Sequence, residues 1–247
     1  MQKVPMVKVI RMVKRRADWT LPQFKDTWLK KHSPMVLRAM DSIPVQKVVA
    51  TFSTGEVALG GKESPIDAMV CLYFKNVEDA RAALAGPSIA AMREDENNFA
   101  EPGAKTVQLL ADEYLMSQRP GPAGAMKTSG QLKALRTVYR RRDLTPAQFK
   151  DYWLQNHSKL EDKVIEMSAM QRIVATFAIP QDGKQPDIDG MAELYFASAE
   201  DIRTMFAGPV PAMMRKDEEN FVQMDAPAIR VVAEEYLLAE RAAAKVA

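Results

Sequence analysis

The sequence predicts an α+β fold in which two tandem copies of one βαββαβ unit close into a single eight-stranded barrel within the chain. Three observations lead to this prediction. The segment at residues 24–33 reappears at residues 149–158 with seven of ten positions identical. Each copy alternates apolar, strand-like runs with capped helices in the ferredoxin-like order, which gives a four-stranded sheet with helices on one face. The other face of such a sheet is bare, and a second copy in the same chain can bury it.

The repeat divides the 247-residue chain into two homologous halves. The copies align with an offset of 125 through the first two strands and with an offset of 122 from the third strand onward. Between them, residues 117–130 contain two Pro and three Gly and have the composition of a linker. We therefore expect a ferredoxin-like unit at residues 1–117, a linker at 118–130 and a second unit at 131–247.

The elements of the first copy follow one another between residues 7 and 116. Residues 7–16 are rich in Val, Ile and Met and predict a strand. Thr20 and Gln23 form a capping box that starts a helix reaching about residue 40, and Thr145 with Gln148 starts the equivalent helix, which reaches about residue 167. The remaining elements are strands at 45–53 and 68–75, a helix at 77–85, a short helical stretch to about 99 and a strand at 106–116.

Composition and charge exclude several classes of protein. Lys and Arg total 34 and Asp and Glu total 32, so the net charge of +2 lacks the basic excess of a nucleic-acid-binding protein. The single cysteine excludes a disulfide framework and a cysteine-rich zinc site. No apolar run is long enough to span a membrane, and the first residues lack the apolar stretch of a signal peptide. We expect a cytoplasmic protein with no nucleic-acid or membrane partner.

Three motifs of this sequence resemble the EthD-domain family of the dimeric α+β-barrel superfamily. They are Phe-x-x-x-Trp-x-x-x-His in both copies, Asp-Gly-x-Ala-Glu-x-Tyr-Phe at residues 189–196 and Asp-Glu-x-Asn-Phe at residues 217–221. The resemblance implies a barrel that houses small organic molecules. It also implies relatives that include cofactor-free cyclases, dehydratases and monooxygenases of aromatic or polyketide-like compounds, besides haem enzymes. Nothing in this sequence selects a haem, a metal or a phosphate-binding cofactor, and we expect no cofactor.

The motif helices carry the two histidines of the chain. His32 follows Trp28 by four residues, and His157 follows Trp153 by four, so each pair shares a helix face. The structural interpretation is that both histidines pack between helix and sheet. The functional interpretation is a general acid or base, work that imidazole does well near neutral pH. The resemblance favours the functional interpretation, because this histidine stands in the family's motif.

The third strand of each copy carries the candidate residues for the barrel interior. Alternation turns one apolar face of this strand toward the helices. The opposite, inward face carries Asp67, Met69, Cys71 and Tyr73 in the first copy and Asp189, Met191, Glu193 and Tyr195 in the second. A carboxylate at Glu193, inside a cavity lined by Met and Tyr, should have a raised pKa and serve acid–base chemistry. The structural alternative is a buried ion pair of Glu193 with Arg136, while Cys71 reads as a small apolar core residue.

Arg11 and Arg136 occupy equivalent positions in the middle of the first strands. Either guanidinium can bind a substrate carboxylate or phenolate through two hydrogen bonds. The alternative is a structural arginine with an acidic partner.

Because the second copy keeps Gly190 and Glu193 of the family pattern, we expect the better-formed site in the C-terminal half.

Together these residues predict a cofactor-independent enzyme of the lyase, cyclase, dehydratase or isomerase type. It would move protons on a small hydrophobic, aromatic or polyketide-like compound in the barrel cavity. The candidate catalytic residues are His157, Glu193 and His32, and the candidate substrate-binding residues are Tyr195, Arg136, Asp189, Tyr73, Arg11, Asp67, Trp153 and Trp28. Two alternatives stay open: a binding or accessory protein without turnover, and a cofactor-free monooxygenase. A homodimer of the whole chain is also left open.

Overall fold

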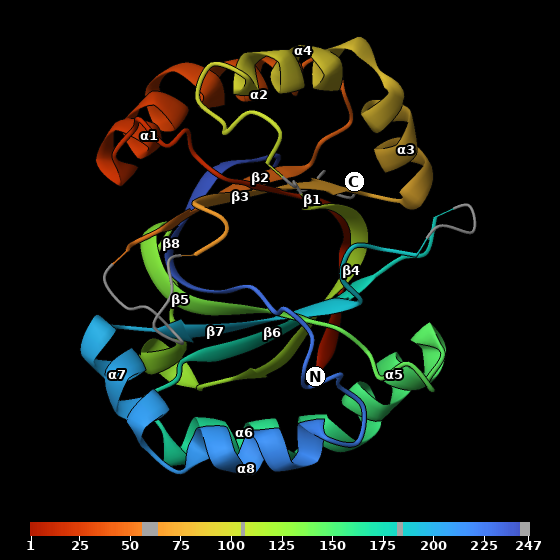
Figure 1. The fold of residues 1–247 in the computed structure, drawn as a ribbon, viewed down its shortest axis with the longest axis vertical. Helices are drawn as coiled ribbons and strands as arrows, with labels where there is room; N and C mark the ends of the chain where they lie inside the picture. Colours follow the sequence, from red (N-terminus) through yellow and green to blue (C-terminus); the bar gives the residue numbers. More distant parts are fainter. Residues whose placement is uncertain (56–63, 105–106, 182–184, 243–247) are drawn as a thin grey trace.

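Eight antiparallel strands close into one barrel (Figure 1). The computed structural model describes residues 1–55, 64–104, 107–181 and 185–242. The strands of the first copy are β1 (Gln2–Val13), β2 (Lys47–Ser53), β3 (Ala68–Phe74) and β4 (Val107–Gln118). Those of the second copy are β5 (Ser129–Val138), β6 (Arg172–Ala178), β7 (Gly190–Phe196) and β8 (Arg230–Glu240).

Around the barrel the strands follow the order β1-β3-β2-β8-β5-β7-β6-β4. Each copy thus contributes one four-stranded sheet, and the pairs β2–β8 and β4–β6 join the two sheets edge to edge. Register shifts in β1, β2, β4 and β5 mark irregularities of the bulge type, which bend strands and help a sheet close. The prediction of tandem ferredoxin-like units that form an intramolecular α+β barrel is confirmed.

Helices cover the outside of both sheets, above and below the barrel in the view of Figure 1. The first copy has α1 (Leu21–Thr27), α2 (Ser33–Ala39), α3 (Val77–Ala85) and α4 (Pro87–Glu96). The second has α5 (Pro146–Tyr152), α6 (Ser158–Met167), α7 (Ala199–Ala207) and α8 (Val210–Glu218). The predicted capping boxes are present at Thr20 and Thr145, where each threonine accepts a hydrogen bond from the backbone of the glutamine three residues on.

The two long helices predicted at residues 20–40 and 145–167 are each interrupted by one wider turn. A π-helical segment, η1 (Trp28–His32), separates α1 from α2, and η3 (Trp153–His157) separates α5 from α6. Hydrophobic spacing over five residues does not distinguish a π-turn from an α-turn, so the sequence did not reveal it. Such π-turns occur frequently at functional sites.

The remaining bounds differ from the predictions at the strand ends. Strand β1 begins five residues earlier than expected, at Gln2, and ends at Val13 instead of residue 16. Strand β4 extends to Gln118, and the linker contains a short 3-10 turn, η2 (Gly121–Gly124), before β5. Thr106, the predicted start of the last strand of the first copy, lies outside the described residues.

Apolar side chains form three cores, and the third of them fills the barrel. Two cores lie between helices and sheet, one in each half. The third lies inside the barrel and includes Ile10, Met69, Cys71, Leu135 and Met191. The inward face predicted for the third strands is therefore correct. Among the described residues, these side chains occupy the place of the predicted central ligand cavity, and the space beside Ile66, Met69 and Leu135 measures about 10 Å³, no more than a water molecule needs.

Candidate functional site

Five charged side chains form a buried network inside the barrel. The Lys8 ammonium lies 2.5 Å from a carboxylate oxygen of Glu113 and 3.2 Å from one of Glu193. The Lys133 ammonium lies 2.5 Å from Glu193 and 2.6 Å from Glu235. Glu193 thus bridges a lysine of the first copy and a lysine of the second.

This network corrects the prediction for Glu193. Burial alone would raise the pKa of this carboxyl, but the two ammonium groups and their hydrogen bonds lower it to about 2. Glu193 is ionised at neutral pH and has lost its capacity to exchange protons there. Its partners are Lys133 and Lys8, so the alternative pairing with Arg136 is also wrong.

The tyrosines and aspartates predicted to bind substrate make hydrogen bonds within the protein. The hydroxyl of Tyr73 donates to Glu113 at 2.9 Å, and that of Tyr195 donates to Glu235 at 2.9 Å. Asp67 and Asp189 each accept the backbone N–H of the arginine that follows the first strand of their copy, at 3.0 Å in both cases. These four residues therefore do not meet in a ligand cavity.

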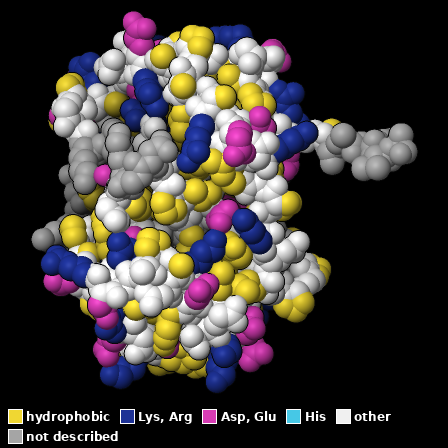
Figure 2. All heavy atoms as spheres, turned by 90° about the vertical axis from the view of Figure 1, so that its right-hand side faces the viewer, with side chains coloured by type: hydrophobic (Ala, Val, Ile, Leu, Met, Phe, Trp, Pro, Cys, Tyr) yellow, Lys and Arg dark blue, Asp and Glu magenta, His cyan; other side chains and the backbone are white. Residues whose placement is uncertain are grey.

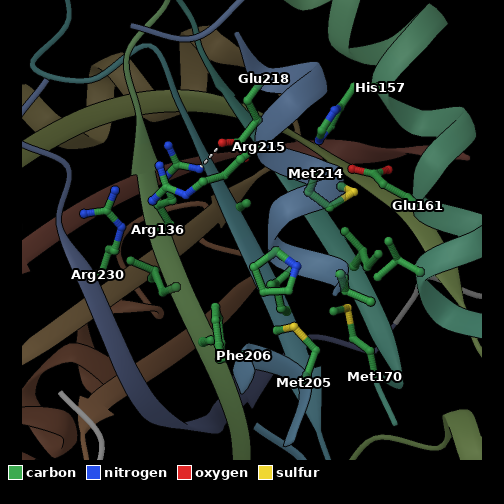
Figure 3. Close-up of a pocket in the computed structure, with 18 of the residues that line it drawn as sticks. Arg136, His157, Glu161, Met170, Met205, Phe206, Met214, Arg215, Glu218 and Arg230 are labelled. Atoms are coloured by element: carbon green, nitrogen blue, oxygen red, sulfur yellow. Dashed lines mark hydrogen bonds and ion pairs between the residues drawn. The ribbon is translucent and has the colours of Figure 1, made fainter. Parts of the chain in front are cut away.

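A cavity of about 130 Å³ lies elsewhere, between the helices and the outer face of the sheet in the C-terminal half (Figure 3). Ala134 and Ala192 contribute small side chains on the sheet side. Helices α6, α7 and α8 close the other side with Val164, Met205, Phe206 and Met214, among others. Phe206 is exposed, and its place in the lining puts one edge of the cavity at the molecular surface.

His157 lines this cavity from the end of the π-helical segment η3. Its Nδ1 lies 2.7 Å from a carboxylate oxygen of Asp217 on α8, and the imidazole is buried. The ring packs against Trp153 and Phe221, with centroids at 5.9 and 5.0 Å. With Nδ1 bonded to a carboxylate, Nε2 is the nitrogen left to exchange a proton with a ligand.

Glu161 stands one turn further on, at the start of α6, and lines the same cavity. The indole N–H of Trp153 donates to its Oε1 at 3.2 Å. Its Oε2 is buried and has no hydrogen-bond partner among the described residues. Burial raises the pKa of Glu161 from 4.5 to about 7, so the carboxyl is half protonated near neutrality.

Three arginines gather on the side of the cavity away from His157 and Glu161 (Figure 3). Arg136 points outward from β5, and its Nη1 lies 2.5 Å from a carboxylate oxygen of Glu218. Arg230 lies directly across from Arg136 on β8. Arg215 on α8 completes the group at the cavity rim. Of these three arginines, only Arg136 was among the predicted substrate-binding residues, and its contact with a ligand stays a prediction.

The N-terminal half repeats part of this arrangement. Nδ1 of His32 lies 2.7 Å from Asp95, which matches the histidine–aspartate pair of the other half. Val36 stands where the second copy has Glu161, and among the described residues the buried indole N–H of Trp28 has no hydrogen-bond partner. Arg11 pairs with Glu96 at 2.5 Å and corresponds to the Arg136–Glu218 pair.

Comparison of the two copies supplies the signal that would have identified the missed residues. The exchange of Val36 for Glu161 places a carboxyl one turn after the motif histidine, on the same side of the helix. Val9 and Val70 of the first copy correspond to Ala134 and Ala192 of the second, which leaves space above the second sheet. The asymmetry that matters for the cavity is therefore on the outer face of the sheet, away from Cys71 and Glu193.

The cavity does not fit a haem. Pockets for drug-sized groups measure about 300–1,000 Å³, and about 130 Å³ is available here. No group of three His, Cys, Asp or Glu side chains among the described residues could hold a metal ion.

Across the described residues no helix is long and apolar enough to cross a membrane. Figure 2 shows basic and acidic side chains interspersed over one face of the molecule.

Both halves match one family model. The model for the EthD domain matches residues 16–103 and 141–225, which together make up more than half of the chain. No curated protein matches the sequence.

Solved structures resemble the chain over almost its whole length. An anthrone oxidase-like protein is 7% identical, with a TM-score of 0.59 and 98% of each chain covered. A Fusobacterium nucleatum protein described as a candidate monooxygenase is 7% identical, with a TM-score of 0.50 and coverage of 95% of this chain and 93% of that one. A chlorite dismutase variant from Candidatus Nitrospira defluvii is 9% identical, with a TM-score of 0.50 and coverage of 92% and 90%. At these identities the likenesses show the fold alone.

Proposed function

The chain belongs to the EthD family, and from this premise we propose that it is a cofactor-independent enzyme that transfers protons on a small hydrophobic compound bound in the C-terminal cavity. The observation that carries the proposal is that His157 and Glu161 line the same cavity. His157 is oriented by Asp217, and Glu161 has a buried, unpaired oxygen and a pKa of about 7. A general base and a general acid work best with pKa values near the operating pH.

The chemistry follows from the two groups. Nε2 of His157 takes a proton from a carbon next to a carbonyl group of the ligand, and the electron pair of the broken C–H bond moves to the carbonyl oxygen. Asp217 stabilises the imidazolium that forms. Protonated Glu161 then returns a proton to the oxygen, to a second carbon or to a leaving group. Isomerisation, cyclisation and elimination of water are all versions of this exchange, which needs no outside electron donor or acceptor.

Deuterium exchange tests the proposal without knowledge of the natural substrate. Single-ring ketones, such as cyclohexanone and 4-oxocyclohexanecarboxylate, are incubated with the protein in D2O, and loss of the α-proton signal is followed by NMR. We expect the protein to accelerate the exchange of at least one ketone. His157→Asn should lower the rate about 100-fold or more, the usual effect of losing a general base.

The first copy offers a matched control. His32 has the same aspartate contact but stands beside Val36 in place of the second carboxyl, so His32→Asn should leave the exchange rate unchanged. Equal losses in both histidine variants would contradict the assignment. Binding of the ketones without accelerated exchange would support the alternative of a non-catalytic binding protein.

A second candidate, cofactor-free oxygenation, is favoured by the anthrone oxidase-like neighbour. Deprotonation by His157 would again come first, and dioxygen would be the co-reactant that accepts the electrons. A ring CH2 group would become a carbonyl, and the second oxygen atom would leave as water. Oxygen consumption on addition of anthrone separates this reaction from proton transfer alone, which proceeds equally well without oxygen.

A further inference from the structure

The arginine cluster of the C-terminal half carries more positive charge than its counterpart in the N-terminal half. Arg136 and Arg230 lie directly opposite one another on neighbouring antiparallel strands. Like charges in this arrangement repel and destabilise a sheet. In the first copy the corresponding positions are Arg11 and Gln108, also paired across strands, so the like-charge contact is absent there.

The exchange of Gln108 for Arg230 also removes a hydrogen-bond acceptor. In the first copy, Arg93 of α4 donates to the side-chain oxygen of Gln108 at 2.9 Å. The residue that corresponds to Arg93 in the second copy is Arg215, which stands near the guanidinium of Arg230 in place of a glutamine. Burial together with the positive charges of Arg136 and Arg215 lowers the pKa of Arg230. Glu218 is the acidic partner of Arg136, so within the lining of the cavity an excess of positive charge remains.

Arg136 also has a buried nitrogen that makes no hydrogen bond to a described residue. Nε of Arg136 is buried and, among the described residues, makes no hydrogen bond, although its Nη1 is bonded to Glu218. A buried donor without a partner is costly, since it has lost its hydrogen bonds to water. A negatively charged oxygen beside the three arginines would compensate both the free donor and the repulsion between Arg136 and Arg230.

The volume of the cavity limits the size of the whole ligand. The cavity measures about 130 Å³, close to engineered protein cavities of about 150 Å³ that hold benzene. Met170, Met205 and Phe206 supply flexible and aromatic contacts on the side shown at the bottom of Figure 3.

We infer that the cavity binds a single-ring compound with one anionic oxygen group, a carboxylate or an enolate, held by Arg136, Arg215 and Arg230. The inference rests on the proposed function, because the same site is used, and it names the substrate class for that site. The anionic group would lie at the arginines and the ring carbons would face His157 and Glu161. An enolate formed there during proton transfer would be stabilised by the same arginines.

Binding of benzoate and benzamide tests the inference, since the two have nearly the same shape and differ in charge. Isothermal titration at one ionic strength should show benzoate binding at least about tenfold more tightly than benzamide, a difference of about 1.4 kcal/mol. Arg230→Gln should remove this preference by restoring the arrangement of the first copy, and Arg230→Lys should keep part of it. Arg203→Gln removes an exposed arginine of α7 outside the cavity lining and should change neither affinity.

The inference would be overturned by equal affinities for the two compounds, by a benzoate preference that survives in Arg230→Gln, or by no binding of either compound at millimolar concentration. Sulfate binding as tight as that of benzoate would likewise contradict the single-ring class. His157→Asn keeps the arginines, so benzoate should still bind to it. A variant that retains benzoate binding and a wild type that exchanges no α-protons would together reject the proposed catalysis while leaving the anion site in place.

Discussion

At the scale of single residues, the raised pKa of Glu161 has a consequence for stability that can be measured. A carboxyl group with a pKa of about 7 in the folded chain and 4.5 when unperturbed binds more protons in the folded state between those pH values. The free energy of unfolding therefore falls as the pH rises through this window. The full effect amounts to about 3 kcal/mol, at about 1.4 kcal/mol per pKa unit.

Substitution of Glu161 by Gln should remove this pH dependence. At pH 4.5 the variant and the wild type should have similar stability, because both side chains are neutral there. At pH 8 the variant should be more stable by up to about 3 kcal/mol. Urea unfolding at several pH values measures the difference. Glu166→Gln, at an exposed position of the same helix, is the control for the loss of one charge. If the free energy of unfolding of Glu161→Gln changes with pH in parallel with that of the wild type, the raised pKa of Glu161 is wrong.

The sequence pattern identified some of the charged residues in the strands and missed others, and the reason is that these strands are buried on both faces. The strands of this barrel are buried on both faces, by helices outside and by the opposite sheet inside. In such strands both faces are apolar, so alternation does not say which face a charged residue occupies. Arg11 and Arg136 were recognised in the first strands, but Lys8 and Lys133, three residues earlier on the opposite face, were not.

At the scale of elements, Thr145 caps α5, the helix that leads into the π-helical segment of His157. The Thr145 hydroxyl oxygen accepts a hydrogen bond from the backbone N–H of Gln148, and the side-chain oxygen of Gln148 accepts one from the backbone N–H of Thr145. This capping box was read directly from the sequence, because it depends on residue types three positions apart. The π-turn that follows was not, since hydrophobic spacing over five residues does not distinguish it from an α-turn. Within it, Trp153 packs against Phe177 and His157 packs against Phe221.

Loss of the cap should cost stability and leave the chemistry unchanged. Thr145→Ala should lower the free energy of unfolding by about 1 kcal/mol, the usual effect at this position. The α-proton exchange rate at 25 °C should stay at the wild-type value, because α5 is also fixed by Phe149 in the core. Thr20→Ala is the matched variant of the first copy and should lose a similar amount. A normal stability with a lowered exchange rate would show that the cap acts on the site itself.

At the scale of the whole molecule, the duplication made closure of the barrel predictable. Each copy has a sheet with one bare face, and the two sheets bury these faces when they close into one barrel. The observed strand order is that of such a closed barrel. The contents of the barrel were not predictable in the same way. Lys8, Glu113, Lys133, Glu193 and Glu235 come from five different strands, and only the closed barrel brings them within hydrogen-bond distance.

The buried network of two lysines and three glutamates connects the two halves of the chain. Each copy has its own lysine–glutamate pair, Lys8 with Glu113 and Lys133 with Glu235. Glu193 contacts both lysines and so links the pair of one copy to the pair of the other. Its counterpart Cys71 cannot do the same, because burial raises the pKa of the thiol to about 12 and keeps it uncharged. One bridging carboxylate therefore serves both halves.

Replacement of Glu193 by Gln should weaken the folded state in a pH-dependent way. The folded pKa of about 2 lies below the unperturbed value of 4.5, so the stabilisation is complete above pH 4.5 and disappears as the pH falls toward 2. At pH 7 the variant should lose about 3 kcal/mol or more, as expected when one partner of a buried ion pair is removed. Below pH 4.5 the two unfolding curves should converge.

The Cys71→Ala variant is the control at the equivalent position of the first copy, since it removes a buried side chain of the same barrel without removing a charge. Its loss of stability should be independent of pH between 3 and 7. If Glu193→Gln behaves in the same pH-independent way, the carboxylate is not the ionic link between the halves. If it instead stabilises the protein at pH 7, the desolvation cost of the network exceeds its attraction, and the edge pairs β2–β8 and β4–β6 with the apolar interior hold the barrel closed.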